Sequence, residues 1–200
     1  MAGLALTLFG GDEAAWTGRQ VDSEPRGAEM EWLFDTRGGE ARNGSTPRPK
    51  IAIVPYDAKH RDAFRVLNEE WLTEYMEIEP EDARVLADPE ATILAGGGAI
   101  VLALDGEEPV GTGALINEGN GRFELAKMAV TRSYRGRGIG RRIAEHLIEV
   151  ARSAGAREVE LVSARLLPAA TPLYRKLGFV EVPLGDNPYA RADIRMVKSL

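Results

Sequence analysis

From Ile51 onward the hydrophobic residues recur with the periods of strands and helices, whereas residues 1–49 have scattered glycines and no sustained period. Short apolar or alternating runs bounded by Gly, Pro, Asn and Asp are typical of strands. They predict strands at 51–56, 99–104, 110–116, 123–130, 158–163, 179–183 and 192–198. Apolar residues at helical spacing predict helices at 57–76, 79–89, 139–154 and 172–178.

The connections between these elements indicate the fold class. Short turns at Asp105–Gly106 and at 117–121 join the strands between residues 99 and 130, which leaves no room for crossover helices and predicts an antiparallel meander. The helix, strand, helix and two strands that follow predict an α/β domain with a mixed sheet. We therefore expect one domain over residues 50–200, preceded by a flexible N-terminal extension and linker over residues 1–49.

Capping residues mark the ends of the predicted helices. Asp57 is placed to cap the first helix, Gly155 to follow the third, and Thr171 with Pro172 to begin the fourth. The first helix is expected to pack through its apolar residues at helical spacing. These are Ala63, Val66, Leu67, Trp71, Leu72 and Tyr75.

The composition narrows the classes of function. The 200-residue chain has a formal net charge of −6, whereas proteins that bind nucleic acid usually carry the opposite balance, so we expect no nucleic-acid partner. It has no cysteine and 2 histidines, which excludes thiolate metal ligands and a cysteine nucleophile and disfavours a histidine metal site. No run approaches the ~20 apolar residues of a membrane span. We expect a cytoplasmic protein without a metal or a membrane partner.

The stretch RSYRGRGIGRR, residues 132–142, departs from the acidic balance and lies between a predicted strand and a predicted helix. A helix start exposes about four unpartnered backbone N–H groups and a partial positive charge, which suits an anion. Its glycines let the backbone approach a phosphate closely. Taken alone, the stretch fits a nucleic-acid patch, a solvated loop or a cradle for a phosphorylated ligand. The patterns GxxxxGK and GxGxxG are both absent, so neither a P-loop nor a dinucleotide fingerprint is indicated.

Two motifs carry a resemblance to a known family. RGRGIG, residues 135–140, matches the Q/R-x-x-G-x-G/A signature of the GCN5-related N-acetyltransferase (GNAT) superfamily, and LYRKLGF, residues 173–179, matches its second common stretch. The sequence resembles this superfamily over residues 51–198, and the order of predicted elements agrees. The resemblance implies the acyl-CoA N-acyltransferase fold, acetyl-CoA as co-substrate, and acetyl transfer to a primary amine by direct attack in a ternary complex.

The resemblance also implies which residues contact acetyl-CoA. In the family the signature loop binds the pyrophosphate through backbone N–H groups, and the preceding strand splays from its neighbour and offers backbone groups to the acetyl carbonyl and the pantetheine arm. The N–H of Met128 would then stabilise the oxyanion of the tetrahedral intermediate. Carried over to this sequence, the cofactor-binding residues are Met128, Ala129, Val130, Arg135, Gly136, Arg137, Gly138, Ile139, Gly140 and Arg141.

Two residues are implied as catalytic. Glu124 lies where several family members place their base, and a regular strand would put it on the same face as Met128. Tyr174 matches the family tyrosine that donates to the CoA sulfur. The alternatives are an outward-facing strand residue for Glu124 and a core aromatic for Tyr174. At Leu167 the sequence lacks an asparagine that many members carry before this helix.

The acceptor is the less determined half of the reaction. A small-molecule or peptide amine is expected, and a homodimer is left open. The alternatives to catalysis are a GNAT module that senses acyl-CoA without turnover and a nucleic-acid binder that uses the arginine cluster. Candidate acceptor-pocket residues are Trp71, Glu74, Tyr75, Glu77, Tyr189, Arg191 and Asp193, and the alternative for Arg191 is recognition of a carboxylate.

Overall fold

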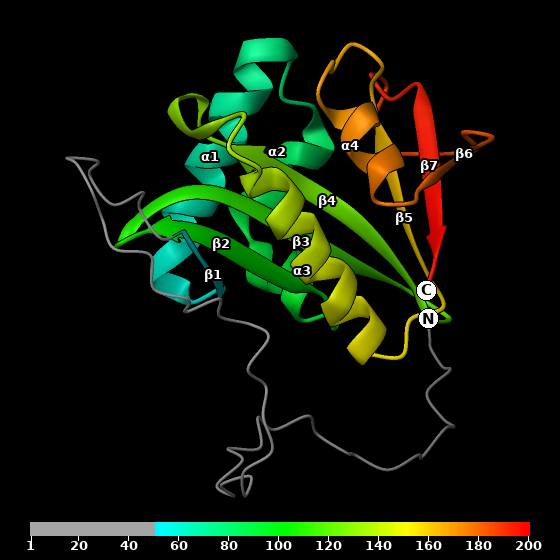
Figure 1. Ribbon diagram of the computed structural model, residues 1–200, viewed down its shortest axis with the longest axis horizontal. Helices are drawn as coiled ribbons and strands as arrows, with labels where there is room; N and C mark the ends of the chain where they lie inside the picture. Colours follow the sequence, from blue (N-terminus) through cyan, green and yellow to red (C-terminus); the bar gives the residue numbers. More distant parts are fainter. Residues whose placement is uncertain (1–50) are drawn as a thin grey trace, which may run out of the picture. The chain divides into compact units, whose positions relative to one another are not determined.

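The computed structural model describes residues 51–200, in which helices pack on a seven-stranded mixed sheet (Figure 1). The strands are β1 (Ala52–Pro55), β2 (Ala99–Asp105), β3 (Glu108–Gly119), β4 (Arg122–Val130), β5 (Glu158–Ser163), β6 (Val180–Val182) and β7 (Ile194–Ser199). The helices are α1 (Arg61–Tyr75), α2 (Pro80–Ala87), α3 (Ile139–Ser153) and α4 (Ala170–Lys176), with short turns η2 (Ala58–His60), η3 (Glu90–Leu94) and η4 (Arg132–Tyr134). The predicted α/β class and order of elements are confirmed. The flexible extension predicted for residues 1–49 lies outside the described residues.

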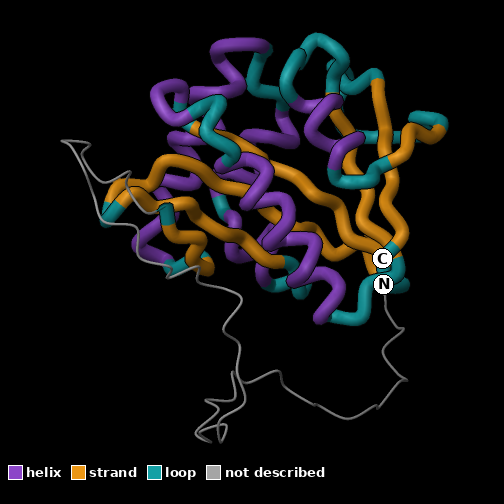
Figure 2. The backbone as a smooth tube through the Cα atoms, viewed as in Figure 1, coloured by secondary structure: helices purple, strands orange, loops and turns teal. Residues whose placement is uncertain are grey.

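The sheet opens in its middle. Its strand order is β1-β2-β3-β4-β5-β7-β6, and β1 to β4 are antiparallel neighbours, as the predicted meander requires. The one parallel pair in this order, β4 with β5, is short: Arg122–Glu124 lie opposite Glu158–Glu160. Beyond these residues the two strands diverge (Figure 2). By contrast, β5 pairs with β7 along its whole length.

Helices cover both faces of the sheet. α3 lies across one face and buries Ile139, Ile143 and Leu147, whose spacing of four residues places them on one side of the helix, in a core shared with α4 (Figure 1). α1 and α2 pack on the other face around Phe64 and Leu72. Among residues 51–200, no helix combines the length and apolar character that crossing a membrane requires.

β4 carries a β-bulge where Lys127 and Met128 together oppose the single residue Gly113 of β3. Lys127 adopts a φ of 52°, in the left-handed region that residues with a Cβ rarely occupy. Gly113 is required by the close packing at this point, since a Cβ there would lie 2.6 Å from both Ile143 Cγ2 and Met128 Sδ. The bulge therefore depends on a glycine in the partner strand.

The bulge overturns one prediction. Glu124 lies opposite Ile116, which packs in the α1–α2 core, so its side chain is on that face of the sheet. Met128 packs in the α3–α4 core on the opposite face. The prediction that these two residues share a face assumed a regular pleat and is wrong, because the bulge between them adds a residue.

Helix ends were predicted with mixed success. Asp57 does cap the first helical turn, since its carboxylate accepts from Lys59 N at 3.0 Å, and Gly155 follows α3 with a φ of 76°. Thr171 is not an N-cap, because α4 begins at Ala170 with Ala169 in that position. The turn at 164–170 already brings the chain into helical geometry, and within the described residues the buried Thr171 hydroxyl has no hydrogen-bond partner.

The buried face of α1 and one short element also differ from prediction. Val66 is 50% exposed, whereas Phe64, which was not predicted to pack, is fully buried. The polar Asn68 is buried as well, because its side-chain amide donates to the Phe64 carbonyl at 2.9 Å. The π-helical turn η3, which follows Pro89, was not predicted, since a single turn has too few residues to show a period.

We expect Gly113→Ala to lower the free energy of unfolding by about 1–3 kcal/mol, because the added methyl group overpacks the contact of β3 with α3. Gly140→Ala is the matched control, since a Cβ there would meet Val130 and Leu173 at ordinary contact distances of 3.8 and 3.9 Å. Urea unfolding of the full chain measures both. A Gly113→Ala variant as stable as the control would contradict the packing described for the bulge.

Candidate active site

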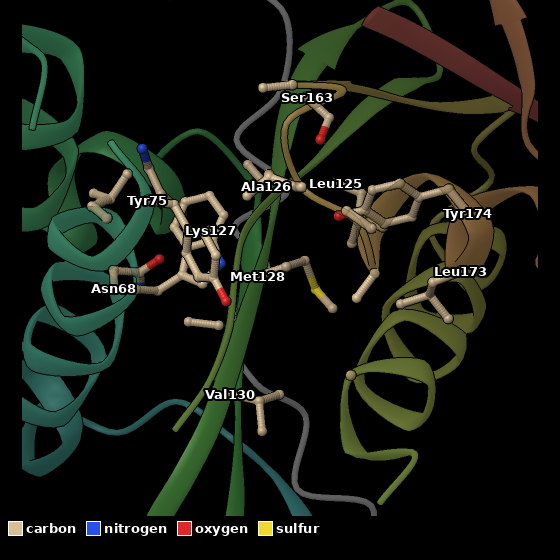
Figure 3. Close-up of a pocket in the computed structure, with 18 of the residues that line it drawn as sticks. Asn68, Tyr75, Leu125, Ala126, Lys127, Met128, Val130, Ser163, Leu173 and Tyr174 are labelled. Atoms are coloured by element: carbon tan, nitrogen blue, oxygen red, sulfur yellow. The ribbon is translucent and has the colours of Figure 1, made fainter. Parts of the chain in front are cut away.

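A pocket of about 380 Å³ lies where β4 separates from β5, with walls from both faces of the sheet. Figure 3 shows Tyr75 and Lys127 on one side of β4 and Leu173 and Tyr174 on the other. The candidate residues line this pocket, apart from Arg137, which lies outside it. They are Glu124, Met128, Ala129, Val130, Arg135, Gly136, Gly138, Ile139, Gly140, Arg141 and Tyr174.

The start of α3 presents backbone donors to one end of the pocket. The first helical hydrogen bond runs from Arg142 N to the Gly138 carbonyl, so the N–H groups of residues 139–141 have no acceptor within the helix. Gly138 is the N-cap residue and has a φ of 78°, and a Cβ at this position would meet nothing within 4 Å. The helix start is therefore open, and its donors and partial positive charge suit a phosphate or pyrophosphate group.

The arginine side chains of this loop are held by the protein. Arg135 donates from Nε to the Val130 carbonyl at 2.9 Å and from Nη1 to Glu74 at 2.8 Å, so it ties the loop to β4 and α1. Arg137 stacks on the Tyr134 ring, Arg141 pairs with Glu145, and Arg142 donates to the Ile51 carbonyl. In this arrangement the loop offers its backbone N–H groups to an anion.

Glu124 lies in the middle of the pocket wall, on the face of β4 that packs toward α1 and α2. Burial raises the pKa of this carboxyl to about 7, and the nearby Glu118 adds to the shift while Lys127 opposes it. No hydrogen bond is among the causes of this pKa shift, as expected for a carboxylate that faces the pocket and not a donor group of the protein. A carboxyl group that titrates near neutrality can exchange protons with a ligand at physiological pH.

Tyr174 lies across the opened sheet from Glu124. Its ring packs edge-to-face against Phe179 with centroids 5.9 Å apart, and its hydroxyl points toward β4 (Figure 3). Burial alone raises the pKa of Tyr174 to about 12, so the hydroxyl keeps its proton at neutral pH. Both interpretations of Tyr174 therefore apply, because its ring packs in the core while its hydroxyl faces the pocket. Leu167 is buried in the wall beside it.

A buried charge network forms the opposite wall. The Asp82 carboxylate, 1% exposed, is 2.8 Å from Lys127 Nζ and 2.6 Å from Arg191 Nη1. Lys127 also donates to the Tyr189 hydroxyl at 3.0 Å. Glu79 is the N-cap residue of α2, and its carboxylate accepts from the backbone N–H groups of Ala190 and Arg191. This network fixes the loop before β7 and the bulge of β4 onto the start of α2.

The network shifts the pKa values of its members. Burial by itself raises the pKa of Asp82, but the hydrogen bonds from Arg191 and Lys127 outweigh it and hold this pKa below its ordinary value. Burial, together with the carboxylates of Glu124 and Asp82, raises the pKa of Tyr189. Asp82 is therefore ionised and Tyr189 neutral at physiological pH.

The acceptor-pocket candidates divide into two groups. Trp71, Tyr75, Tyr189 and Arg191 line the pocket, whereas Glu74, Glu77 and Asp193 do not. Each of two excluded acids has a structural partner: Glu74 pairs with Arg135, and Asp193 accepts from Arg165 N at 2.8 Å.

Sequence reasoning missed several pocket residues, among them the polar residues Asn68, Asp82 and Lys127. Asp82 lies 45 residues from Lys127 in the chain, and no local pattern signals that pairing. One signal was available: a lysine in FELAKMAV interrupts the apolar run from Leu125 to Val130, and a buried lysine requires a partner. In the described part of the chain no group of three or more His, Cys, Asp and Glu side chains is placed to hold a metal ion.

A mixed sheet that opens between two central strands, with a glycine-rich helix start at the opening, defines a GNAT-type acyltransferase domain. The chain belongs to the acetyltransferase (GNAT) family, whose model matches residues 61–179. A search of curated protein sequences found no match to this chain.

Solved structures show the same fold. A GNAT-family acetyltransferase from Staphylococcus aureus Mu50 is 23% identical with a TM-score of 0.69, over 75% of this chain and 99% of that one. The yncA protein of Salmonella typhimurium, solved with its cofactor acetyl-CoA, is 19% identical with a TM-score of 0.61, over 75% and 94%. The PaiA N-acetyltransferase of Thermoplasma acidophilum, solved with coenzyme A, is 16% identical with a TM-score of 0.59, over 76% and 99%.

We expect Asp82→Asn to destabilise the full chain by about 3–5 kcal/mol at pH 7, because it leaves two buried cations with one charged partner fewer. Since the pKa of Asp82 is lowered in the folded state, its stabilising effect is present above pH ~4 and is lost as the pH falls through the folded-state pKa. Glu81→Gln is the control, because Glu81 pairs with Arg84 at the surface, where a pair contributes about 0.5 kcal/mol.

Urea unfolding between pH 3 and pH 8 measures both variants. The difference between wild type and Asp82→Asn should shrink toward acid pH. A difference that is the same at both ends of this range would contradict the ionised state assigned to Asp82.

Proposed function

We propose that this protein is an N-acetyltransferase that moves an acetyl group from acetyl-CoA to a primary amine by direct attack in a ternary complex. The observation that carries the proposal is a single pocket that joins an open helix start, a carboxyl group with a pKa of about 7 and a protonated tyrosine. Membership of the acetyltransferase (GNAT) family supports it, as do the relatives solved with acetyl-CoA or coenzyme A.

The fit to CoA rests on the α3 side of the pocket. The N–H groups of residues 139–141 would hold the pyrophosphate, and the glycines at 136 and 138 place no side chain of their own there. The backbone of β4 from Met128 to Val130 no longer pairs with β5, so it is available to the pantetheine arm. Bound acetyl-CoA would supply the activated acetyl thioester.

The proton transfers are assigned to groups on opposite faces of the sheet. Glu124, on the α1–α2 face, accepts the proton that an incoming ammonium must lose, directly or through water. Tyr174, on the α3–α4 face, holds its proton at Oη and is the donor on the side where the thioester is expected. The acceptor amine therefore enters from the α1–α2 face.

We expect Gly138→Asp to weaken acetyl-CoA binding at least tenfold relative to Gly138→Asn. Both side chains tolerate the left-handed backbone of this residue and have similar shape, so the comparison isolates a negative charge at the anion-binding end. Titration calorimetry with acetyl-CoA measures the two variants and the wild type. Equal affinity in the two variants would contradict the assignment of the pyrophosphate to the α3 start.

We expect Glu124→Gln to lower kcat about 100-fold at pH 8, measured as free thiol released with an amine that the wild type acetylates. In the wild type, activity should rise with pH through about 7, as the carboxyl group ionises, and this limb should be absent from the variant. Tyr174→Phe is the comparison: it should lower the plateau without moving the midpoint. A wild-type midpoint that persists in Glu124→Gln would rule out Glu124 as the base.

A stability measurement separates this effect from misfolding. The pKa of Glu124 is raised in the folded state, so ionising it costs stability as the pH rises from about 4.5 through 7. Glu124→Gln should therefore melt at a higher temperature than the wild type at pH 8 and at the same temperature at pH 4.

If acetyl-CoA binds but no amine on a broad panel releases thiol, the protein is an acyl-CoA sensor instead.

A further inference from the structure

The α1–α2 half of the pocket has an aromatic wall. Trp71 and Tyr75, one helical turn apart on α1, lie with ring centroids 6.3 Å apart at 44°, and both line the pocket. Tyr189 adds a third ring from the loop before β7, where Lys127 lies 5.1 Å and Arg191 4.6 Å from its centroid. Rings fixed in this way offer flat apolar surface to a ligand without further ordering.

The cations of this half are already neutralised. Lys127 and Arg191 share the Asp82 carboxylate, and Arg191 lies 3.3 Å from Glu79 as well. Arg135 pairs with Glu74, and its Nη2, which has no hydrogen-bond partner among the described residues, is buried from solvent. Lys127 and Arg191 therefore cannot receive a carboxylate from a ligand without breaking a pair inside the protein.

The acidic side is not balanced in the same way at Glu124 itself, which pairs with no cation among the described residues. The charged groups that most affect it are Glu118 of β3, Lys127 of β4, Glu160 of β5 and Glu81 of α2, of which Glu160 and Glu81 are paired with Arg195 and Arg84. Lys127 is the cation among these charged groups, and it is already paired with Asp82. The point at which the amine must lose its proton therefore carries the carboxylates of Glu124 and Glu118, which pair with no cation among the described residues, and this negative charge attracts an ammonium and repels an anion.

We propose that the acceptor is an aromatic primary amine that carries no carboxylate beside its amino group. This inference rests on the proposed function for the direction of attack. The ring lies against Trp71 and Tyr75, the amino group lies at Glu124, and a carboxylate on the neighbouring carbon would meet Glu124 without a free cation to bind it.

Three matched compounds test the charge: phenethylamine, phenylalanine and phenylalaninamide. The amide keeps the bulk of the carboxylate without its charge, so it separates repulsion from steric exclusion. At pH 8.5 we expect kcat/KM for phenethylamine and phenylalaninamide to exceed that for phenylalanine at least tenfold. Phenylalanine within threefold of its amide would overturn the inference.

The aromatic wall is tested with n-propylamine. Phenethylamine should exceed it at least tenfold in kcat/KM, and Trp71→Leu should remove most of this advantage. Val66→Ala, an exposed change on another side of α1, should preserve it. Equal use of the two amines by the wild type would overturn the aromatic part of the inference.

Glu79→Gln tests the role of the paired cations. It removes one of the two carboxylates at Arg191 while its amide oxygen can still accept from the backbone of Ala190 and Arg191. The preference for phenylalaninamide over phenylalanine should fall at least threefold. Glu149→Gln, at the surface of α3, should leave it unchanged. An undiminished preference in Glu79→Gln would contradict the charge argument.

Binding of the same compounds to the protein loaded with CoA, measured by calorimetry, separates this inference from the proposed function. Selective binding of phenethylamine and the amide without thiol release would sustain the inference and refute catalysis. Turnover of other amines with no binding of these compounds would sustain catalysis and refute the inference. Absence of both binding and turnover would refute both.

Discussion

The separation of β4 from β5 after Glu124 is the constraint on which the rest of the site depends. If these two parallel strands stayed paired, backbone hydrogen bonds and side chains would fill the middle of the sheet. No pocket could then be lined from both the α1–α2 face and the α3–α4 face. Because the pairing stops, β4 backbone groups and side chains from both faces line one pocket. The opening also brings Glu124 and Tyr174, the proposed base and acid on opposite faces of the sheet, into one pocket.

The bulge in β4 is maintained by packing and charge. A non-glycine residue at a φ of 52° costs about 1–3 kcal/mol, and burying its ammonium costs more unless it is paired. Lys127 is held by Asp82 and Tyr189 on one face, and Met128 and Gly113 fit against α3 on the other. These contacts outweigh the strain, and they couple α2 and the loop before β7 to the strand that lines the pocket.

The parts of the site that could be predicted from the sequence are those that depend on interactions between residues close together in the chain. Strand and helix periods and the RGRGIG motif are local, so the order of elements, the start of α3 and the pocket positions of Tyr174 and Gly138 were predictable. Glu124 was also placed in the pocket, but its face was wrong, because the bulge is set by the partner strand and by Gly113.

The longer-range pairings could not be read in this way. The Asp82–Lys127 pair and the contacts of Arg191 join segments far apart in the sequence, and no spacing rule connects them. The arginines show the same limit: their number in the loop does not reveal that Arg135 and Arg142 are bound to α1 and to the backbone of Ile51. Composition gives the charge of a loop, and only the fold gives the direction of its side chains.

The two ends of the pocket differ in charge, and this difference gives the site a direction. The α3 start carries partial positive charge and free N–H groups, whereas the region of Glu124 is acidic and its neighbouring cations are paired. An anionic CoA and a cationic amine would therefore be drawn to opposite ends of one cavity and kept from exchanging places. Burial is the largest cause of the raised pKa of Glu124, and neighbouring acids add to it. The carboxyl group therefore titrates near pH 7, and its surroundings still attract an ammonium. In the proposed reaction, substrate attraction and proton acceptance, which place opposite demands on the charge of a carboxylate, would in this way be met by one residue.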